Sequence, residues 1–354
     1  MSDDIPFELQ AEIINRVHPV KSLIRFRSFS KQWKSLIDSS EFITHHTLNN
    51  NKTQPQHLLV RYITRATGHR FVSADACLLE EKYVSIVDDD SFHHHKFSPV
   101  VPPTVKLFVC PLMLDYSHGL VCLLGYTRDR VNRKKLVVVW NPLIGKSVGI
   151  EIPDRADIVI GFGVCPKTSD PKIVKISRFV EATAEVFTLS SGAWRSVPMN
   201  IPFKSLHFQN SQVVIDGVIR WLTYDKITYK HRFYSFDLAS EKFGEAADFP
   251  YNLAGHSGRL YRISKINDSL VVLSHHCIVT NLTPKRFCDV LMMLKNGVPK
   301  PSFTKLFTVN DVRVNSMIGF RKNGQPIMLG THQRSWDLWV GLQDDLLQRV
   351  TTFA

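Results

Sequence analysis

The chain has 354 residues, of which 44% are hydrophobic and 21% charged, and its formal net charge is +12. This composition is typical of a globular protein, and the length allows a small module and one large domain. No apolar run approaches the roughly 20 residues of a membrane span, and the acidic start at residues 1–4 is unlike a signal peptide. Six scattered cysteines without a close pair indicate reduced thiols, so we expect a cytoplasmic or nuclear protein without a membrane partner.

A first helix is predicted after Pro6, because the fixed φ of proline suits the first turn of a helix. We expect Pro19 to end this helix, because proline lacks an amide hydrogen and disfavours the helical conformation of the residue before it. The apolar residues between them recur at three- and four-residue steps and predict one apolar face, formed by Leu9, Ile13, Ile14 and Val17.

Two more short helices are predicted up to residue 46, one around Leu23 and Phe26 and the next around Trp33, Leu36 and Ile37. Three helices of this size contain too little core to be robust alone. Their remaining apolar surface therefore needs either the rest of the chain or a second protein.

This helical segment resembles the F-box, the module that binds a Skp-type adaptor in cullin-based ubiquitin ligases. The plant members with a C-terminal F-box-associated interaction domain are the most similar. One departure is Val17-His18, which stands where the family usually has a single Leu, and we expect a longer turn between helices to absorb it. The matching residues are Ile5-Pro6, the run from Pro19 to Arg27, the run from Lys31 to Ile37, and Phe42.

The resemblance implies that helices within residues 5–43 dock on the adaptor. Trp33 fits an internal core position equally well, and the alternative for the whole segment is a three-helix cap packed on the larger domain. Lys21, Arg25 and Arg27 are candidates for pairing with acidic adaptor residues. The residues expected to form the apolar side of the contact, or to hold its helices together, are Ile5, Pro6, Leu9, Ile13, Pro19, Val20, Leu23, Phe26, Trp33, Leu36 and Ile37.

Residues 47–56 are polar and rich in Asn and Thr, which predicts a linker between an F-box at 1–46 and an interaction domain at 57–354. Beyond the linker the hydrophobic period changes to two, and short β-branched or aromatic runs alternate with turn residues. Several units also contain a second strand pair, of which residues 233–245 are the clearest. Turn markers recur about every 50 residues, within the range of propeller blades, at Gly68, Gly119, Asp170, Gly217, Asp268 and Gly324.

The fold expected is therefore a small all-α N-terminal module of three helices followed by a large all-β domain. We predict that this domain is a β-propeller of about six four-stranded blades, and a pair of β-sandwiches is the alternative. Trp140-Asn141-Pro142, Trp194 and residues 234–237 resemble the F-box-associated interaction domain, which is a degenerate, kelch-like repeat region.

No residue pattern in the sequence indicates catalysis, a cofactor or a metal. His93-His94-His95 lies in a predicted extended loop, where consecutive side chains point in different directions. Asp88-Asp89-Asp90 is predicted to be a solvated acidic loop, and His275-His276 a pair at a strand end. The basic run 128–135 is predicted to be a solvated hairpin loop, so we expect no nucleic-acid partner.

The resemblance implies a substrate-recognition subunit of a Skp–cullin–F-box E3 ubiquitin ligase, a non-catalytic receptor that acts by proximity. Its expected partners are the Skp-type adaptor, through it a cullin, and a target protein that the sequence does not identify. Loops at 87–104 and 126–135 are candidates for target binding, because recognition concentrates on loops held by a rigid scaffold. The alternatives are a glycosidase-like propeller enzyme with carboxylates in its central channel, and an adaptor-independent interaction or ligand-sensing protein.

Overall fold

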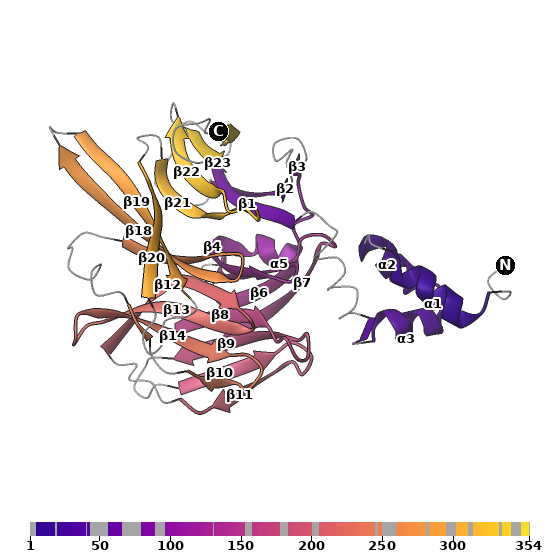
Figure 1. Cartoon of the computed structure of the whole chain (residues 1–354). Coiled ribbons are helices and arrows are strands. Elements are labelled where there is room, and N and C mark those ends of the chain that lie inside the picture. The colour runs from indigo at the N-terminus through magenta and orange to yellow at the C-terminus, as the bar shows by residue number, and fades with distance from the viewer. Residues whose placement is uncertain are drawn as a thin grey trace.

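The computed structural model describes residues 5–17, 20–39, 41–42, 56–65, 79–88, 96–129, 131–152, 158–177, 183–199, 205–244, 247–249, 260–280, 283–294, 302–310, 314–332, 335–340 and 348–353. Three helices come first and strands form almost everything after them, as predicted (Figure 1). In Figure 1 the three helices, in indigo, lie apart from the sheets. No helix in these described ranges is long and apolar enough to cross a membrane.

The helices are α1 (Phe7–Asn15), α2 (Val20–Phe26) and α3 (Lys31–Ile37). α1 begins directly after Pro6, but the prediction that it runs to Pro19 is wrong. The amide of Arg16 donates to the carbonyl of Ile13 at 3.1 Å and that of Val17 to Ile14 at 3.0 Å. These tighter three-residue turns end the helix at Asn15, before the proline is reached. His18 and Pro19 lie outside the described residues.

A small core holds the three helices together. Its buried members are Ile14, Leu23, Ile37 and Phe42, and Val17, Phe26, Trp33 and Leu36 pack against them partly buried. α3 also has an N-cap, because the hydroxyl of Ser30 accepts the amide of Trp33 at 3.0 Å. A serine cap of this kind stabilises a short helix by satisfying one of its free amides.

The rest of the described chain forms six antiparallel sheets. The first contains β1 (Gln56–Arg65), β2 (Leu79–Asp88) and β3 (Lys96–Phe97). After α5 (Pro103–Lys106), the second contains β4 (Phe108–Ser117), β5 (Leu120–Thr127), β6 (Lys135–Asn141) and β7 (Lys146–Ile152). The third contains β8 (Ile158–Val164), β9 (Pro171–Ser177), β10 (Thr183–Thr188) and β11 (Ala193–Val197).

The fourth sheet contains β12 (Leu206–Ile215), β13 (Val218–Asp225), β14 (Lys230–Asp237) and β15 (Lys242–Phe243), and β16 (Ala247–Asp248) also pairs with β14. The fifth contains β17 (Leu260–Ile266), β18 (Ser269–Thr280), β19 (Thr283–Leu294) and β20 (Ser302–Val309). The sixth contains β21 (Val314–Phe320), β22 (Pro326–His332), β23 (Ser335–Val340) and β24 (Gln348–Phe353). The first strand begins at Gln56, the last residue of the predicted linker.

The predicted turn markers lie where the first strand of a sheet turns back into the second. This is confirmed for Gly119, Asp170, Gly217, Asp268 and Gly324, whereas Gly68 lies outside the described residues. The turn between β12 and β13 shows the reason. Asp216 and Gly217 have φ angles of 53° and 72°, and such left-handed residues match the twist of a two-residue hairpin. The recurring turns are therefore set by local backbone chemistry.

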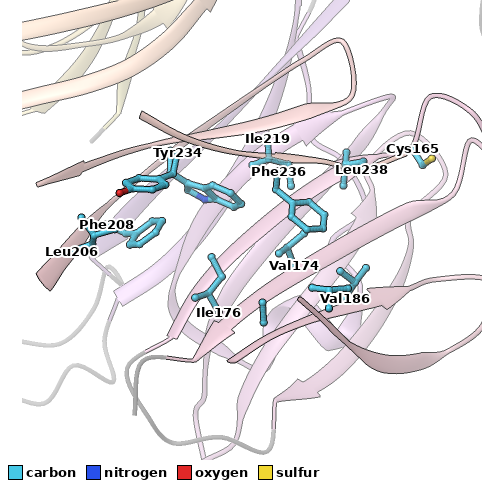
Figure 2. Close-up of a cluster of buried hydrophobic side chains, with 13 residues drawn as sticks. Cys165, Val174, Ile176, Val186, Leu206, Phe208, Ile219, Tyr234, Phe236 and Leu238 are labelled. Atoms are coloured by element: carbon cyan, nitrogen blue, oxygen red, sulfur yellow. The ribbon is translucent and has the colours of Figure 1, made fainter. Parts of the chain in front are cut away.

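The sheets pack in chain order, each sharing an apolar cluster with the next. Figure 2 shows the cluster between the third and fourth sheets, where Val174 and Ile176 of β9 face Ile219 of β13 and Phe236 of β14. Two β-sandwiches would instead pack their sheets only in pairs. Members of the shared clusters at the five junctions, one from each of the two sheets, are Tyr83 and Trp140, Val139 and Phe162, Val174 and Phe236, Leu222 and Val272, and Val290 and Met317.

A buried ion pair joins the first sheet to the last. A carboxylate oxygen of Asp88, at the end of β2, accepts Nε of Arg321 at 2.7 Å, and its other oxygen accepts the amide of Lys322 at 2.8 Å. The side chains of Asp88 and Arg321 are 3% and 9% exposed. The prediction of a solvated acidic loop is thus wrong for Asp88, because a cation from a strand pair far along the chain covers it. Asp89 and Asp90 lie outside the described residues.

Candidate functional site

One side of α1 carries apolar side chains that the chain itself leaves exposed. Ile5, Leu9 and Ile13 are 43%, 51% and 57% exposed. Leu9 and Ile13 lie one turn apart on one side of α1, Ile5 precedes the helix in the chain, and we call these three residues the α1 stripe. The prediction of a single apolar face is wrong, because Ile14 is only 1% exposed and points into the core with Val17. α1 therefore has two apolar sides, and one of them stays exposed among the residues that the structure describes.

Aromatic rings extend the exposed apolar surface at the other helices. Phe29, which follows α2, is 72% exposed, and its ring centroid lies 6.0 Å from that of Phe26 and 6.1 Å from that of Trp33. Phe26 and Trp33 meet edge to face at 5.6 Å. Trp33 is partly buried, so it belongs both to the core and to the edge of the exposed surface.

A hydrogen-bond relay fixes the α1 stripe relative to α3. The indole Nε1 of Trp33 donates to Oε1 of Gln10 at 2.8 Å, and Nε2 of Gln10 donates to the carbonyl of Ile5 at 2.7 Å. Both termini of the Gln10 amide are thus used to order the start of α1. The sequence reasoning missed Gln10, since a contact across 23 residues leaves no local pattern.

The predicted cations differ in what they can contact. Nη2 of Arg27 donates to the carboxylate of Asp38 at 2.7 Å, so this guanidinium ties the end of α2 to the end of α3. Arg25 is exposed on α2. The side chain of Lys21 lies outside the part of the chain that the structure describes.

The predicted apolar set also divides by burial. Leu23 and Ile37 are 4% and 8% exposed and hold the helices together. Phe26, Trp33 and Leu36 are partly buried in the same core, and Pro6 is exposed beside the stripe. Pro19 and the side chain of Val20 lie outside the described residues.

Of the two loops proposed for target binding, residues 126–135 are bonded to the chain just beyond the other loop, 87–104. The amide of Arg128 donates to the carbonyl of Leu107 at 2.8 Å, and its Nε donates to the carbonyl of Lys106 at 3.2 Å. The carboxylate of Asp129 accepts the amide of Val131 at 2.9 Å. This turn leaves Val131 90% exposed, and Val100 is 75% exposed in the other loop.

The basic run 128–135 joins β5 to β6, which confirms the predicted hairpin connection. Its cations have partners on the same sheet. The guanidinium of Arg133 lies 4.5 Å from the ring centroid of Tyr126, a distance at which the two groups attract. Nζ of Lys134 donates to the carboxylate of Glu151 at 2.8 Å. The loop is therefore a positively charged surface anchored to the sheet.

The alternative of a glycosidase-like propeller enzyme requires a pair of carboxylates in the central channel. Contacts link β4, β8, β12, β17 and β21, the first strands of five sheets, to one another in series, and their sequences contain one carboxylate, Asp115. Burial raises the pKa of Asp115 to about 6, and Nε2 of Gln212 donates to it at 3.0 Å. A glycosidase of the usual kind needs two carboxylates about 5–10 Å apart. These five strands do not supply such a pair.

The histidines singled out in the sequence were examined as possible metal ligands or strand-end residues. Among the described residues no group of three or more His, Cys, Asp and Glu could hold a metal ion, and His93, His94 and His95 lie outside them. The prediction that His275 and His276 end a strand is wrong, because β18 continues to Thr280 by pairing with β19. Nε2 of His275 accepts the amide of Met317 at 3.1 Å, and the ring of His276 stacks on Phe287.

Comparison with known proteins follows the same division of the chain. Residues 2–45 match the F-box domain, and residues 114–335 match the F-box associated beta propeller domain. The F-box protein At2g21930 of Arabidopsis thaliana is 28% identical, over 68% of this chain and 60% of that protein. The F-box protein At5g18160 of the same plant is 24% identical, over 93% of this chain and 87% of that protein. The β-propeller domain of the Trilobed protease from Pyrococcus furiosus has a TM-score of 0.39 and 13% identity, over 66% of this chain and 82% of that one.

Proposed function

This chain belongs to the F-box proteins that carry an F-box associated beta propeller domain, and we propose that it is the substrate-recognition subunit of a Skp–cullin–F-box E3 ubiquitin ligase. In this proposal residues 1–46 dock on the Skp-type adaptor and through it on a cullin. Residues 47–56 are the linker, and the β domain at 57–354 captures the target protein.

The observation that carries the adaptor proposal is the exposed α1 stripe. The helical unit has four buried apolar side chains in its core, yet Ile5, Leu9 and Ile13 are exposed. Burying an aliphatic side chain of this size contributes about 1.5–3 kcal/mol, so a partner that covers the stripe gains substantially. An adaptor-independent protein would bury this surface on its own β domain, and in this chain the stripe is exposed.

The polar part of the proposed contact is assigned to Arg25 and Lys21, which would face acidic residues of the adaptor. Arg27 is bonded to Asp38 and acts in this proposal by holding α2 against α3. Leu23 and Ile37 likewise act by holding the helices together, because both are buried in the helical core.

For the β domain we propose that the six sheets are the six blades of a propeller. The chain-order packing of neighbouring sheets supports this, and so does the Asp88–Arg321 pair between the first and the last sheet. The target surface in this proposal includes loop 126–135, and loop 87–104 is a second candidate, because its Val100 lies beside Gly145 at the other end of β6. The exposed Val131 in the same loop as the cations Arg128 and Arg133 suits a target with an acidic patch and an apolar residue.

The proposed mechanism needs no reactive group in this chain. A receptor that holds a target lysine near a charged conjugating enzyme raises the effective concentration of that lysine. The lack of a carboxylate pair on β4, β8, β12, β17 and β21 is compatible with this non-catalytic role. We place the activity in the cytoplasm or nucleus, which the free cysteines Cys122, Cys165, Cys277 and Cys288 support.

The test is the affinity of the full chain for purified Skp-type adaptor, measured by titration calorimetry. Ile13→Asp places a charge in the proposed apolar contact and should weaken binding about 100-fold or more. The matched control is Gln32→Asp, which adds the same charge at an exposed position of α3 outside the stripe. Leu23→Asp would be uninformative, because Leu23 lies in the core and its loss would unfold the helices.

Circular dichroism of each variant establishes that the helices and sheets are retained. Adaptor affinity within about twofold of the unchanged chain for Ile13→Asp would refute the assignment of the stripe. No binding by the unchanged chain would refute the receptor proposal itself.

A further inference from the structure

The hairpin of β18 and β19 is longer than the rest of the sheet to which it belongs. Among the described residues, β17 pairs with β18 only as far as His275, and β20 pairs with β19 only from Cys288 onward. Residues 276–280 and 283–287 pair with each other beyond these points and form a two-stranded extension, which we call the β18–β19 arm. In Figure 1 the two long orange strands extend past the other strands of their sheet.

A ring contact supports the arm where it leaves the sheet. His276 of β18 and Phe287 of β19 are opposite each other in the register, and their rings stack with centroids 5.2 Å apart. Such cross-strand pairs stabilise a hairpin. A two-stranded ribbon is nevertheless only marginally stable in water. A third strand would therefore stabilise the arm as well as bind to it.

The backbone of β18 presents hydrogen-bonding groups along the open edge of the arm. In an antiparallel ladder, the amide and carbonyl of alternate residues point to opposite edges of the strand. The two-residue turn at 267–268 pairs Ile266 with Ser269, and a turn of this length directs the backbone groups of its closing residues toward each other. The odd-numbered residues of β18 thus point toward β17. Beyond the end of β17, the groups of Cys277 and Val279 point to an edge that no described strand covers.

The two edges of the arm differ in their chemistry. The edge of β19 contains Pro284, which has no amide hydrogen, followed by Lys285 and Arg286. Proline and charged residues are the means by which proteins protect a strand edge from further pairing. The edge of β18, residues 276–280, contains no proline, lysine or arginine, and its Ile278 is 48% exposed. The β18 edge is therefore the one suited to accept another strand.

Charge indicates which kind of strand fits. Residues 276–287 contain Lys285 and Arg286 and no Asp or Glu. A second copy of the chain would place two cationic arms side by side, which is unfavourable. An acidic strand would be attracted instead, because β19 lies two strand spacings, about 10 Å, from the added strand. This distance is roughly one Debye length at physiological salt, so the attraction is not fully screened.

We propose that the β18 edge of the arm binds an extended acidic segment of the target protein as a third strand. The segment pairs its backbone with Cys277 and Val279, and its apolar side chains lie beside Ile278. Strand addition of this kind gains affinity from main-chain hydrogen bonds. The inference rests on the proposed receptor function and deepens it by naming the class of segment that a target presents. It involves no residue of the proposed adaptor contact.

The probe is the fluorescein-labelled peptide Glu-Val-Thr-Ile-Glu-Val-Glu, whose binding to the full chain is followed by fluorescence anisotropy. One matched peptide has lysine in place of every glutamate. Another carries N-methyl groups on its three central residues, which removes amide hydrogens from both edges of the peptide and keeps its side chains. A Kd of about 0.1–1 mM is expected for the acidic peptide. Both matched peptides should bind at least about tenfold more weakly.

A pair of variants then locates the site. Val279→Pro removes an amide hydrogen from the open edge of β18 and should weaken binding of the acidic peptide about tenfold. Val279→Thr keeps that amide hydrogen and the branched residue type, and should leave the affinity within about twofold. If Val279→Pro fails to fold, the N-methylated peptide makes the same test without a change in the protein.

No binding of the acidic peptide, equal binding of the N-methylated peptide, or equal affinities of a folded Val279→Pro variant and the unchanged chain would overturn the proposal. A dimer of the full chain in sedimentation velocity that Val279→Pro dissociates would assign the edge to a second copy and also overturn it. Adaptor affinity is measured on the same samples. Adaptor binding without peptide binding refutes the role of the arm alone, whereas peptide binding without adaptor binding refutes the adaptor proposal.

Discussion

The junction between the first and last sheets offers a sharp test of how the β domain is held together. Asp88→Ala removes the carboxylate that accepts Nε of Arg321 at 2.7 Å and the amide of Lys322 at 2.8 Å. The guanidinium, whose side chain is 9% exposed, is then left without this counter-ion in a buried site. We expect a large loss of stability from this one change.

The magnitude follows from burial. Removing one partner of a buried ion pair typically costs about 3–5 kcal/mol, because a buried charge loses its compensation. The surface pair of Lys134 and Glu151 has a similar distance of 2.8 Å, but its side chains are 53% and 51% exposed. Glu151→Ala should therefore cost less than about 1 kcal/mol. The contrast between the two variants depends on burial and not on hydrogen-bond length.

The assay is thermal unfolding of the full chain, followed by tryptophan fluorescence. For a domain of this size about 2 °C is expected per kcal/mol, so Asp88→Ala should lower Tm by roughly 6–10 °C and Glu151→Ala by less than about 2 °C. The double variant Asp88→Ala/Arg321→Met should recover part of the loss, because no charge is then left buried. Equal shifts for Asp88→Ala and Glu151→Ala would refute the reasoning.

Three further predictions concern single residues. Burial raises the pKa of Asp115 to about 6, above its usual value of 3.8, so the folded state favours the protonated acid and loses stability as pH rises between those values. Asp115→Asn should therefore stabilise the protein by about 3 kcal/mol at pH 7.5 and by little at pH 4. Urea unfolding at both pH values measures this, and a gain that is equal at both would contradict it. Gly161→Ala would bring a methyl group within 2.3 Å of Cζ2 of Trp221, and the overpacking should cost about 1–3 kcal/mol, seen as a lower urea midpoint. Leu23→Ala should cost about 2–5 kcal/mol and melt the helices at a temperature at which the sheets persist, measured by circular dichroism; loss of both together would show that the helices depend on the β domain.

Local chemistry in the sequence was sufficient for the class and order of the elements. A hairpin turn such as Asp216-Gly217 needs residues that adopt positive φ, and that requirement concerns only a few neighbouring residues. The start of α1 after Pro6 is determined over a similarly short range. The turn markers were therefore visible at their spacing of about 50 residues, and the motif-bearing helices were visible with them.

Only the tertiary structure decided which side chains face outward and which distant residues meet. Ile13 and Ile14 are identical neighbours, yet one is 57% exposed and the other 1%, because the core of α2 and α3 lies on one side of α1. The sequence predicted that Asp88 belongs to a solvated loop, but in the structure its carboxylate is bonded to Arg321, 233 residues later in the chain. Gln212 meets Asp115 across 97 residues in the same way. Such contacts depend on how whole sheets pack, and packing brings together residues whose spacing along the chain carries no signal.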